Sequence, residues 1–111
     1  MTPRLNRKLV LEHPEIHPDG AGGYDSAWVV KGFLWGEITA RTGREQAQGG
    51  APVSRMNFRI VVRAAPYGAP DRPQPQQRFR EGDRIFLIEA VAEEDADNRY
   101  LTCFATEEVA V

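Results

Sequence analysis

The chain has 111 residues, of which 41% are hydrophobic and 27% charged, proportions that fit one folded domain and exclude a wholly disordered chain. The 14 Lys and Arg against 16 Asp and Glu give a formal charge of −2, which excludes a general electrostatic attraction to nucleic acid or to an acidic membrane surface. Cys103 is the single cysteine, so an intramolecular disulfide and a cysteine-rich metal cage are excluded, and a reducing cytoplasm fits. No stretch approaches the ~18 apolar residues of a membrane span, and no signal peptide is expected.

The 10 glycines and 8 prolines fall in clusters between short β-type runs, which is typical of an all-β protein. Residues 8–12 predict a first strand, which stops at His13 and Pro14. A cluster of turn-forming residues at 17–23 then predicts a wide turn.

The next β-rich region covers residues 28–31 and 33–40. Gly32 and Gly36 predict a bulge or a sharp bend there, because glycine inside a strand weakens regular pairing. A bent strand of this kind is typical of small barrels. Residues 41–46 predict at most a short helical turn, since the glycines and proline that follow end any helix.

The clearest strand covers residues 54–63, where apolar and polar side chains alternate with an interruption only at Val61. One face is therefore expected in the core, and the other is basic. The apolar positions are Met56, Phe58, Ile60 and Val62, and the polar positions are Arg55, Asn57, Arg59 and Arg63.

Two long loops are expected, at about residues 42–53 and 64–77; the second carries enough prolines to forbid a regular helix or a central strand. Residues 84–91 and 100–105 predict an antiparallel C-terminal hairpin, joined by an acidic turn. The predicted fold is one all-β domain over residues 1–111, a small antiparallel β-barrel or sandwich with long loops.

No catalytic or metal site is predicted. His13 and His17 are four residues apart, but each precedes a proline and no third ligand accompanies them. The serines and histidines form no hydrolase motif. Cys103 lies on an apolar strand and is expected to be a buried structural residue rather than a nucleophile. The sequence therefore indicates neither an enzyme nor a cofactor.

Positive charge is concentrated between residues 55 and 84. This asymmetry leaves three interpretations open: a solvated strand face, a surface facing phosphates, or a face that meets an acidic neighbour, such as the turn at 93–97 of another subunit. The arginines are Arg55, Arg59, Arg63, Arg72, Arg78, Arg80 and Arg84.

Ordered motifs along nearly the whole chain are similar to those of one family. They are residues 5–12 (LNRKLVLE), 19–24 (DGAGGY) ahead of Trp28, 34–38 (LWGEI) running into 42–45 (TGRE), 54–55 with 58–60, 78–86 (RFREGDRIF) and 99–101 (RYL). In this order the chain resembles the small head-tail adaptor, or head-closure, proteins of long-tailed phages. The proline-rich segment and residues 103–108 (CFATEE) look most like the branch found in gene transfer agents.

The resemblance implies a structural, non-catalytic protein that assembles as a sixfold or twelvefold ring beneath the portal and its adaptor. Such a ring closes the DNA-filled head and offers the tail a platform. The implied partners are copies of the same chain, the portal-side adaptor, a tail terminator or tail tube protein, and packaged double-stranded DNA. The protein would reside in the bacterial cytoplasm during assembly and then in the head-tail connector of a phage or phage-like particle.

Within that picture, one loop is expected to face the channel or the neighbouring subunit and the proline-rich segment to meet another ring. The channel or intersubunit candidates are Arg44, Glu45, Gln46, Arg55 and Arg59, and the candidates for contact with a partner ring are Tyr67, Asp71, Arg72 and Gln74.

Two alternatives stay open. A stand-alone nucleic-acid-binding β-barrel would use the arginines with Phe58 and Tyr67 as phosphate and stacking contacts. A neighbouring ring of the same connector, an adaptor or a tail terminator, is the other.

Overall fold

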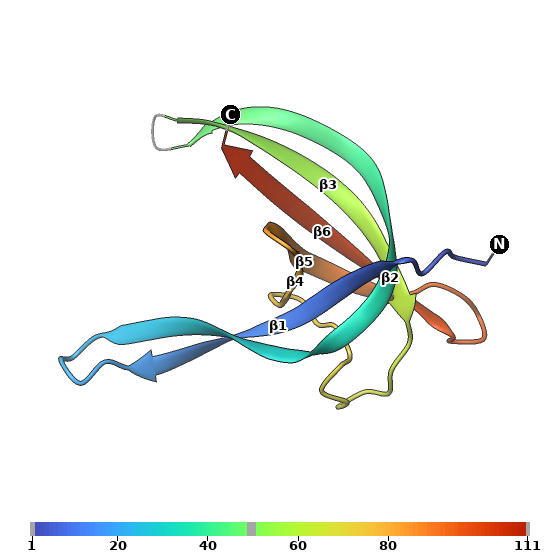
Figure 1. The fold of residues 1–111 in the computed structure, drawn as a ribbon, viewed down its shortest axis with the longest axis horizontal. Helices are drawn as coiled ribbons and strands as arrows, with labels where there is room; N and C mark the ends of the chain where they lie inside the picture. The colour runs from blue at the N-terminus through green and yellow to red at the C-terminus, as the bar shows by residue number, and fades with distance from the viewer. Residues whose placement is uncertain (1, 49–50, 111) are drawn as a thin grey trace.

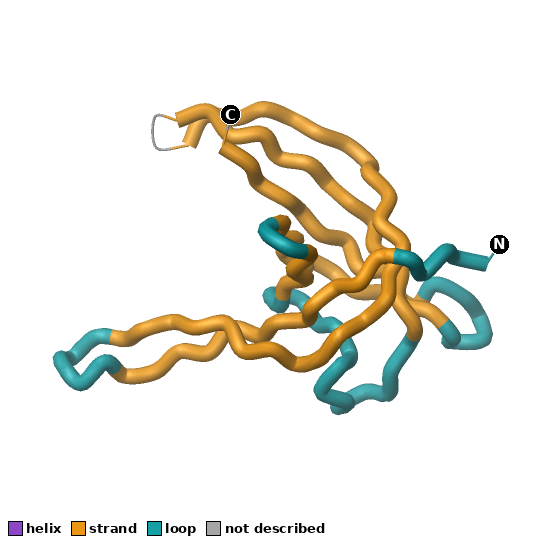
Figure 2. Tube along the Cα trace, viewed as in Figure 1, coloured by secondary structure: helices purple, strands orange, loops and turns teal. Residues whose placement is uncertain are grey.

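The computed structural model describes residues 2–48 and 51–110, and the side chains of residues 42–54 and 109–110 lie outside the description. Six strands and no helix occur among the described residues: β1 (Arg7–Pro18), β2 (Tyr24–Gln48), β3 (Ala51–Arg63), β4 (Arg78–Glu81), β5 (Arg84–Glu93) and β6 (Tyr100–Ala110) (Figures 1 and 2). All pairings are antiparallel, and the order β1-β2-β3-β6-β5-β4 closes as a barrel. The prediction of an all-β fold is confirmed. No described segment forms a helix suited to crossing a membrane.

Strand β2 organises the barrel because it pairs with β1 over its first half and with β3 over its second half, changing partner at Gly36. Two register shifts bend β2. In the pairing with β1, Lys31 has no partner residue, and in the pairing with β3, Arg41 has none. The bulge predicted near Gly32 is thus confirmed. At Gly36 an added Cβ would lie 2.9 Å from Leu9 Cδ1 and 3.2 Å from the Val61 carbonyl oxygen, so glycine permits the close crossing there.

The loop predicted at 42–53 is wrong, and so is the helical turn predicted at 41–46. Residues up to Gln48 belong to β2, and β3 begins at Ala51, with pairing that runs from Thr42↔Asn57 to Gln48↔Ala51. The polar, glycine-containing sequence favours a loop locally. Pairing with β3, whose apolar and polar residues alternate, overrides that preference, since pairing satisfies the backbone hydrogen-bonding groups of both strands.

The barrel interior holds a single apolar cluster, and the alternation predicted for β3 is confirmed within it. Phe58 and Phe86 pack edge to face, with ring centroids 5.2 Å apart. Burial raises the pKa of the Cys103 thiol to about 12, which agrees with the predicted structural role. The buried members are Leu9, Leu11, Leu34, Phe58, Ile60, Val62, Phe79, Phe86, Ile88, Leu101, Cys103 and Ala105, with Met56 packed against them.

The predicted C-terminal hairpin is confirmed as the antiparallel pair β5 and β6. Strand β4 was not predicted. It joins β5 through a two-residue turn in which Gly82 has φ 60°, the positive value that a type II′ turn requires at its first central position.

Two parts of the molecule extend beyond the barrel. The outer part of β1 pairs only with β2, so that the two strands project as a ribbon (Figure 1). At its tip Asp19 Oδ1 accepts hydrogen bonds from the backbone N–H groups of Ala21 and Gly23, at 2.8 and 3.0 Å. The segment between β3 and β4, residues 64–77, contains no strand.

Candidate functional site

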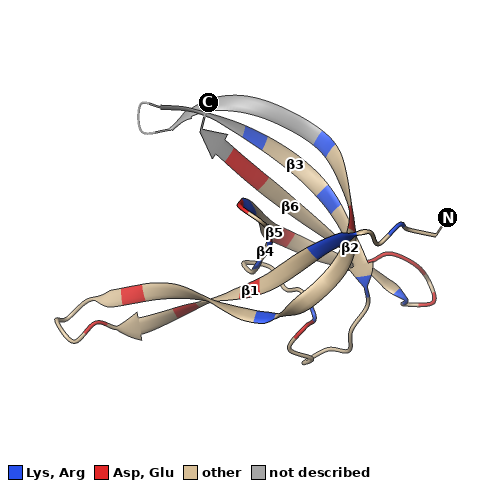
Figure 3. Ribbon diagram, viewed as in Figure 1, with Lys and Arg blue, Asp and Glu red and all other residues tan. Residues whose placement is uncertain are grey.

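The predicted basic surface on β3 is largely neutralised within the chain. Arg55 forms an ion pair with Glu108 of β6, and Arg59 forms one with Glu94, which follows β5. Figure 3 shows basic positions on β3 beside an acidic position on β6. Hydrogen bonds from the Thr102 hydroxyl and from Arg59 hold the pKa of Glu94 below its ordinary value, so Glu94 is ionised at neutral pH. The acidic neighbour of Arg59 is therefore a carboxylate of the same chain.

The other channel candidates, Arg44, Glu45 and Gln46, lie on β2 rather than on a loop, opposite Arg55, Ser54 and Val53. Their side chains are outside the described residues. The structure therefore places these candidates on the β2–β3 ladder that also carries Arg55, and their role stays a prediction.

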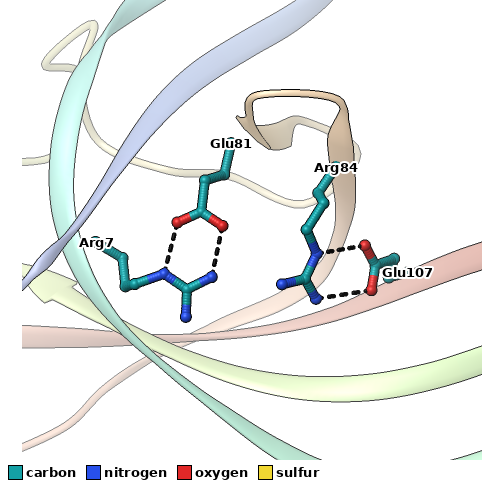
Figure 4. Close-up of polar contacts among 4 residues, drawn as sticks. All are labelled: Arg7, Glu81, Arg84 and Glu107. Atoms are coloured by element: carbon teal, nitrogen blue, oxygen red, sulfur yellow. Dashed lines mark hydrogen bonds and ion pairs between the residues drawn. The ribbon is translucent and has the colours of Figure 1, made fainter.

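Two bidentate ion pairs fix the turn between β4 and β5 (Figure 4). Arg7 donates to both carboxylate oxygens of Glu81, at 2.6 and 2.5 Å, and Arg84 donates to both oxygens of Glu107, at 2.8 and 2.9 Å. The hydrogen bond from Arg7 lowers the pKa of Glu81, and the hydrogen bond to Glu107 raises the pKa of Arg84. The turn is thus tied to β1 on one side and to β6 on the other.

A third cluster centres on the buried carboxylate of Glu12 on β1. Arg78 Nε donates to one of its oxygens at 2.7 Å and Arg80 Nε to the other at 3.1 Å. The guanidinium of Arg78 also lies 4.0 Å from the ring centroid of Trp28. The sequence analysis counted Arg78 and Arg80 among the residues of a basic surface. In the structure they hold β4 against β1.

The proline-rich segment 64–77 is organised by its own contacts. Arg72 is only 8% exposed; its guanidinium lies 3.8 Å from the Tyr67 ring centroid and donates to the Ala65 carbonyl oxygen at 2.6 Å. Tyr67 is 81% exposed, and Asp71 and Gln74 are also exposed. Arg72 therefore supports the segment from within, while the other three candidates present surface to solvent.

One surface was missed in the sequence. Four large side chains of β2, Trp28, Val30, Phe33 and Trp35, are exposed on the outside of the barrel, and Phe33 and Trp35 are 63% and 54% exposed. We call this surface the aromatic face. Its signal was present as alternate apolar positions on both sides of the Lys31 bulge. Exposed aromatic residues that gather on one strand mark a surface for another macromolecule.

The family model described as phage head completion protein matches residues 1–108. The chain belongs to the phage head completion protein family. Among solved structures it is similar to a chain of "Virion of native gene transfer agent (GTA) particle", with 55% identity, a TM-score of 0.89, and coverage of 99% of this chain and 100% of that chain. No curated protein matches the chain. The predicted resemblance is confirmed.

Head completion proteins are structural, which agrees with the prediction that the chain is not an enzyme. The surfaces that matter in such a protein are those that meet other macromolecules. The arginines of β3 and β4 are largely used inside the fold of this head completion protein. Its aromatic face and segment 64–77 carry exposed aromatic side chains, as does the outer end of the β1–β2 ribbon at Tyr24.

Proposed function

We propose that this head completion protein is a component of a gene transfer agent particle, where copies of it form a ring between the portal-side adaptor and the tail. The ring closes the DNA-filled head and provides the platform for the tail. The observation that carries the proposal is the likeness to a chain of a native gene transfer agent virion, which extends over 99% of this chain at 55% identity. The chain would act in the bacterial cytoplasm during assembly and then in the connector of the particle.

The shape of the subunit supports this role. A closed barrel supplies a rigid body, and two extensions project from it (Figure 1). One is the hairpin of β1 and β2, and the other is the hairpin of β2 and β3, along which β6 pairs with β3. As part of the proposal, the β2–β3 hairpin with Arg44, Glu45 and Gln46 faces the channel or the neighbouring subunit. Segment 64–77, with exposed Tyr67, meets an adjoining ring formed by the adaptor, the tail terminator or the tail tube protein.

Independent nucleic-acid binding is less well supported. That function would use Phe58 and Tyr67 as stacking platforms. Phe58 is buried against Phe86, whereas Tyr67 is exposed and has the Arg72 guanidinium 3.8 Å from its ring centroid. It would also need free guanidinium groups, whereas Arg55 and Arg59 are paired with carboxylates. Contact with packaged DNA in the proposed ring therefore depends on assembly and not on an intrinsic affinity of the monomer.

Deleting the gene in the producing strain tests the proposal. We expect DNA-filled heads that lose their DNA, together with free tails, when particles are counted by electron microscopy. Expression of the intact chain in the same strain should restore complete particles and serves as the control. Normal particles without the gene would overturn the proposal, and tails of uncontrolled length would indicate a tail terminator instead.

A further inference from the structure

The barrel carries a second exposed apolar surface, on β5. Leu87 is 41% exposed between the buried Phe86 and Ile88. The register shift at Glu89 then reverses the alternation, so that Val91 packs against the core while Ala90 and Ala92 are exposed. Leu87, Ala90 and Ala92 therefore lie on the outside of the barrel, and we call them the β5 face.

The aromatic face and the β5 face lie on opposite walls. In the closed order β1-β2-β3-β6-β5-β4, strand β2 is three places from β5 in either direction. The two faces also differ in shape, since one consists of large projecting side chains and the other mainly of small ones. Two different apolar surfaces on opposite sides of a subunit are what a head-to-tail ring needs, because each copy must contact one neighbour with each side.

Unpaired charges near the two faces are complementary. Lys8 and Lys31 accompany the aromatic face, with the Lys8 ammonium 4.9 Å from the Phe33 ring centroid. Glu89 is exposed at the bulge of β5, and Glu93 is exposed at the end of the strand, on the side of its cross-strand partner Leu101. Within the described part of the chain, neither lysine and neither glutamate belongs to an ion pair. Contact between the two faces would bring opposite charges together, which favours the correct orientation of the neighbour.

The aromatic face also has a recess. A cavity of about 340 Å³ lies beside Phe33 and Trp35 and is lined on its other side by Arg63, Ala64, Ala65 and Asp71. A recess with aromatic walls at the edge of an exposed apolar face is the usual location of the side chains that dominate the free energy of protein association.

We propose that the aromatic face of one copy packs on the β5 face of the next copy, so that β2 and β5 form the contact between subunits of the ring. The inference depends on the proposed function, which supplies the ring, and adds which walls of the barrel meet.

Cross-linking in assembled particles tests the contact. The chain with Trp35→Cys and Leu87→Cys replaces the intact chain in the deletion strain, and particles are treated with a short bismaleimide and separated under denaturing conditions. We expect a ladder of dimers, trimers and larger species. Cys103 is buried and does not compete for the reagent. The matched control combines Leu87→Cys with Ala21→Cys at the exposed tip of the β1–β2 ribbon and should give no ladder.

The single variant Trp35→Cys separates the alternatives. Trp35→Cys alone should give monomers, whereas dimers would show that two aromatic faces meet symmetrically and would overturn the proposal. A cross-link from the thiol introduced at position 35 to a protein of another size would overturn it in favour of a different partner. Complete particles without a ladder in the double variant would reject this contact and leave the proposed function standing, since that function is judged by the gene deletion.

Charge reversal gives a second test that does not depend on linker length. Lys8→Glu with Lys31→Glu should reduce incorporation of the protein into particles several-fold, measured by immunoblot of purified particles. Adding Glu89→Lys and Glu93→Lys should restore incorporation. Both pairs are exposed, so the folded monomer is expected to persist, which circular dichroism checks. Equal incorporation of the intact chain, the variant with two substitutions and the variant with four would contradict the proposed contact.

Discussion

The seam between β3 and β6 and the seam between β1 and β4 hold the same barrel closed by different means. The first is a long backbone ladder, running from Val53↔Ala110 to Arg63↔Tyr100. The second runs only from Val10↔Arg80 to Glu12↔Arg78, and charged side chains reinforce it on both sides of Phe79. A short strand with few ladder hydrogen bonds is thus fixed by one buried aromatic ring and by guanidinium–carboxylate contacts. The two kinds of closure should respond differently to mutation, acid and salt.

The largest effect is expected from the apolar side of the short closure. Phe79→Ala removes the fully buried ring of β4, which lies opposite Leu11 of β1 and opposite Phe86 of β5. We expect the free energy of unfolding to fall by about 4 kcal/mol, since the substitution leaves a cavity in a packed core. Urea denaturation followed by circular dichroism measures it.

The matched control is Phe33→Ala on the aromatic face, because it deletes the same side chain from an exposed site. It should change the free energy of unfolding by less than about 1 kcal/mol. Equal losses in the two variants would mean that the short closure does not depend on its buried ring.

The buried carboxylate of Glu12 gives the next largest effect. Glu12→Gln removes the negative charge that faces both Arg78 and Arg80 and leaves two guanidinium groups without their partner. We expect a loss of about 3 kcal/mol, as for one member of a largely buried ion cluster. Glu15→Gln on the same strand is the control, because among the described residues the ion-pair partner of Glu15 is the exposed His17. This substitution should change stability by less than about 0.5 kcal/mol.

Acid should reveal the same cluster in the intact chain. Burial raises the pKa of Glu12, but the hydrogen bonds from Arg78 and Arg80 lower it by more, so the folded value lies below the ordinary 4.5. The stabilisation is therefore complete above about pH 4.5 and is lost as the pH falls through the folded pKa. The difference in stability between the intact chain and Glu12→Gln should shrink over that range. A difference that is constant down to pH 3 would contradict the ionic explanation.

The contrast between the seams also explains which features the sequence could predict. The alternation in β3 is contained in ten neighbouring residues, so it predicted both the strand and its buried face. Strand β4 has one apolar residue, Phe79, between arginines, and its counterpart Glu12 is 66 residues from Arg78 in the chain. No local pattern connects them. The loop wrongly predicted at 42–53 has the same origin, since its polar residues are held as strands by partners across the ladder.

The candidate site also depends on contacts between residues that are distant in the sequence. The arginines of β3 were visible in the sequence, but the carboxylates that neutralise them, Glu94 and Glu108, lie 35 and 53 residues further along the chain. The aromatic face was equally visible as alternate residues. Alternation alone does not tell which of two apolar rows on β2 is covered, because that depends on how the barrel closes.

The smallest effect is expected at the partly exposed pair of Arg84 and Glu107, which joins the β4–β5 turn to β6 (Figure 4). Arg84→Gln should cost about 1 kcal/mol, because solvent screens the charges while the bidentate geometry adds hydrogen bonds. Arg84→Lys keeps the positive charge, which lies 4.9 Å from the Phe86 ring centroid, but loses the fork that meets both carboxylate oxygens. We therefore expect the stability of Arg84→Lys to fall between those of Arg84→Gln and the intact chain.

In 1 M NaCl the difference in stability between Arg84→Gln and Arg84→Lys should narrow, since added salt screens an exposed charge far more than a buried one. The loss in Glu12→Gln should persist at the same salt concentration, because Glu12 is buried. If salt reduced both losses equally, the short closure would be held by surface charges alone, and the distinction between the two seams would rest only on the length of their ladders.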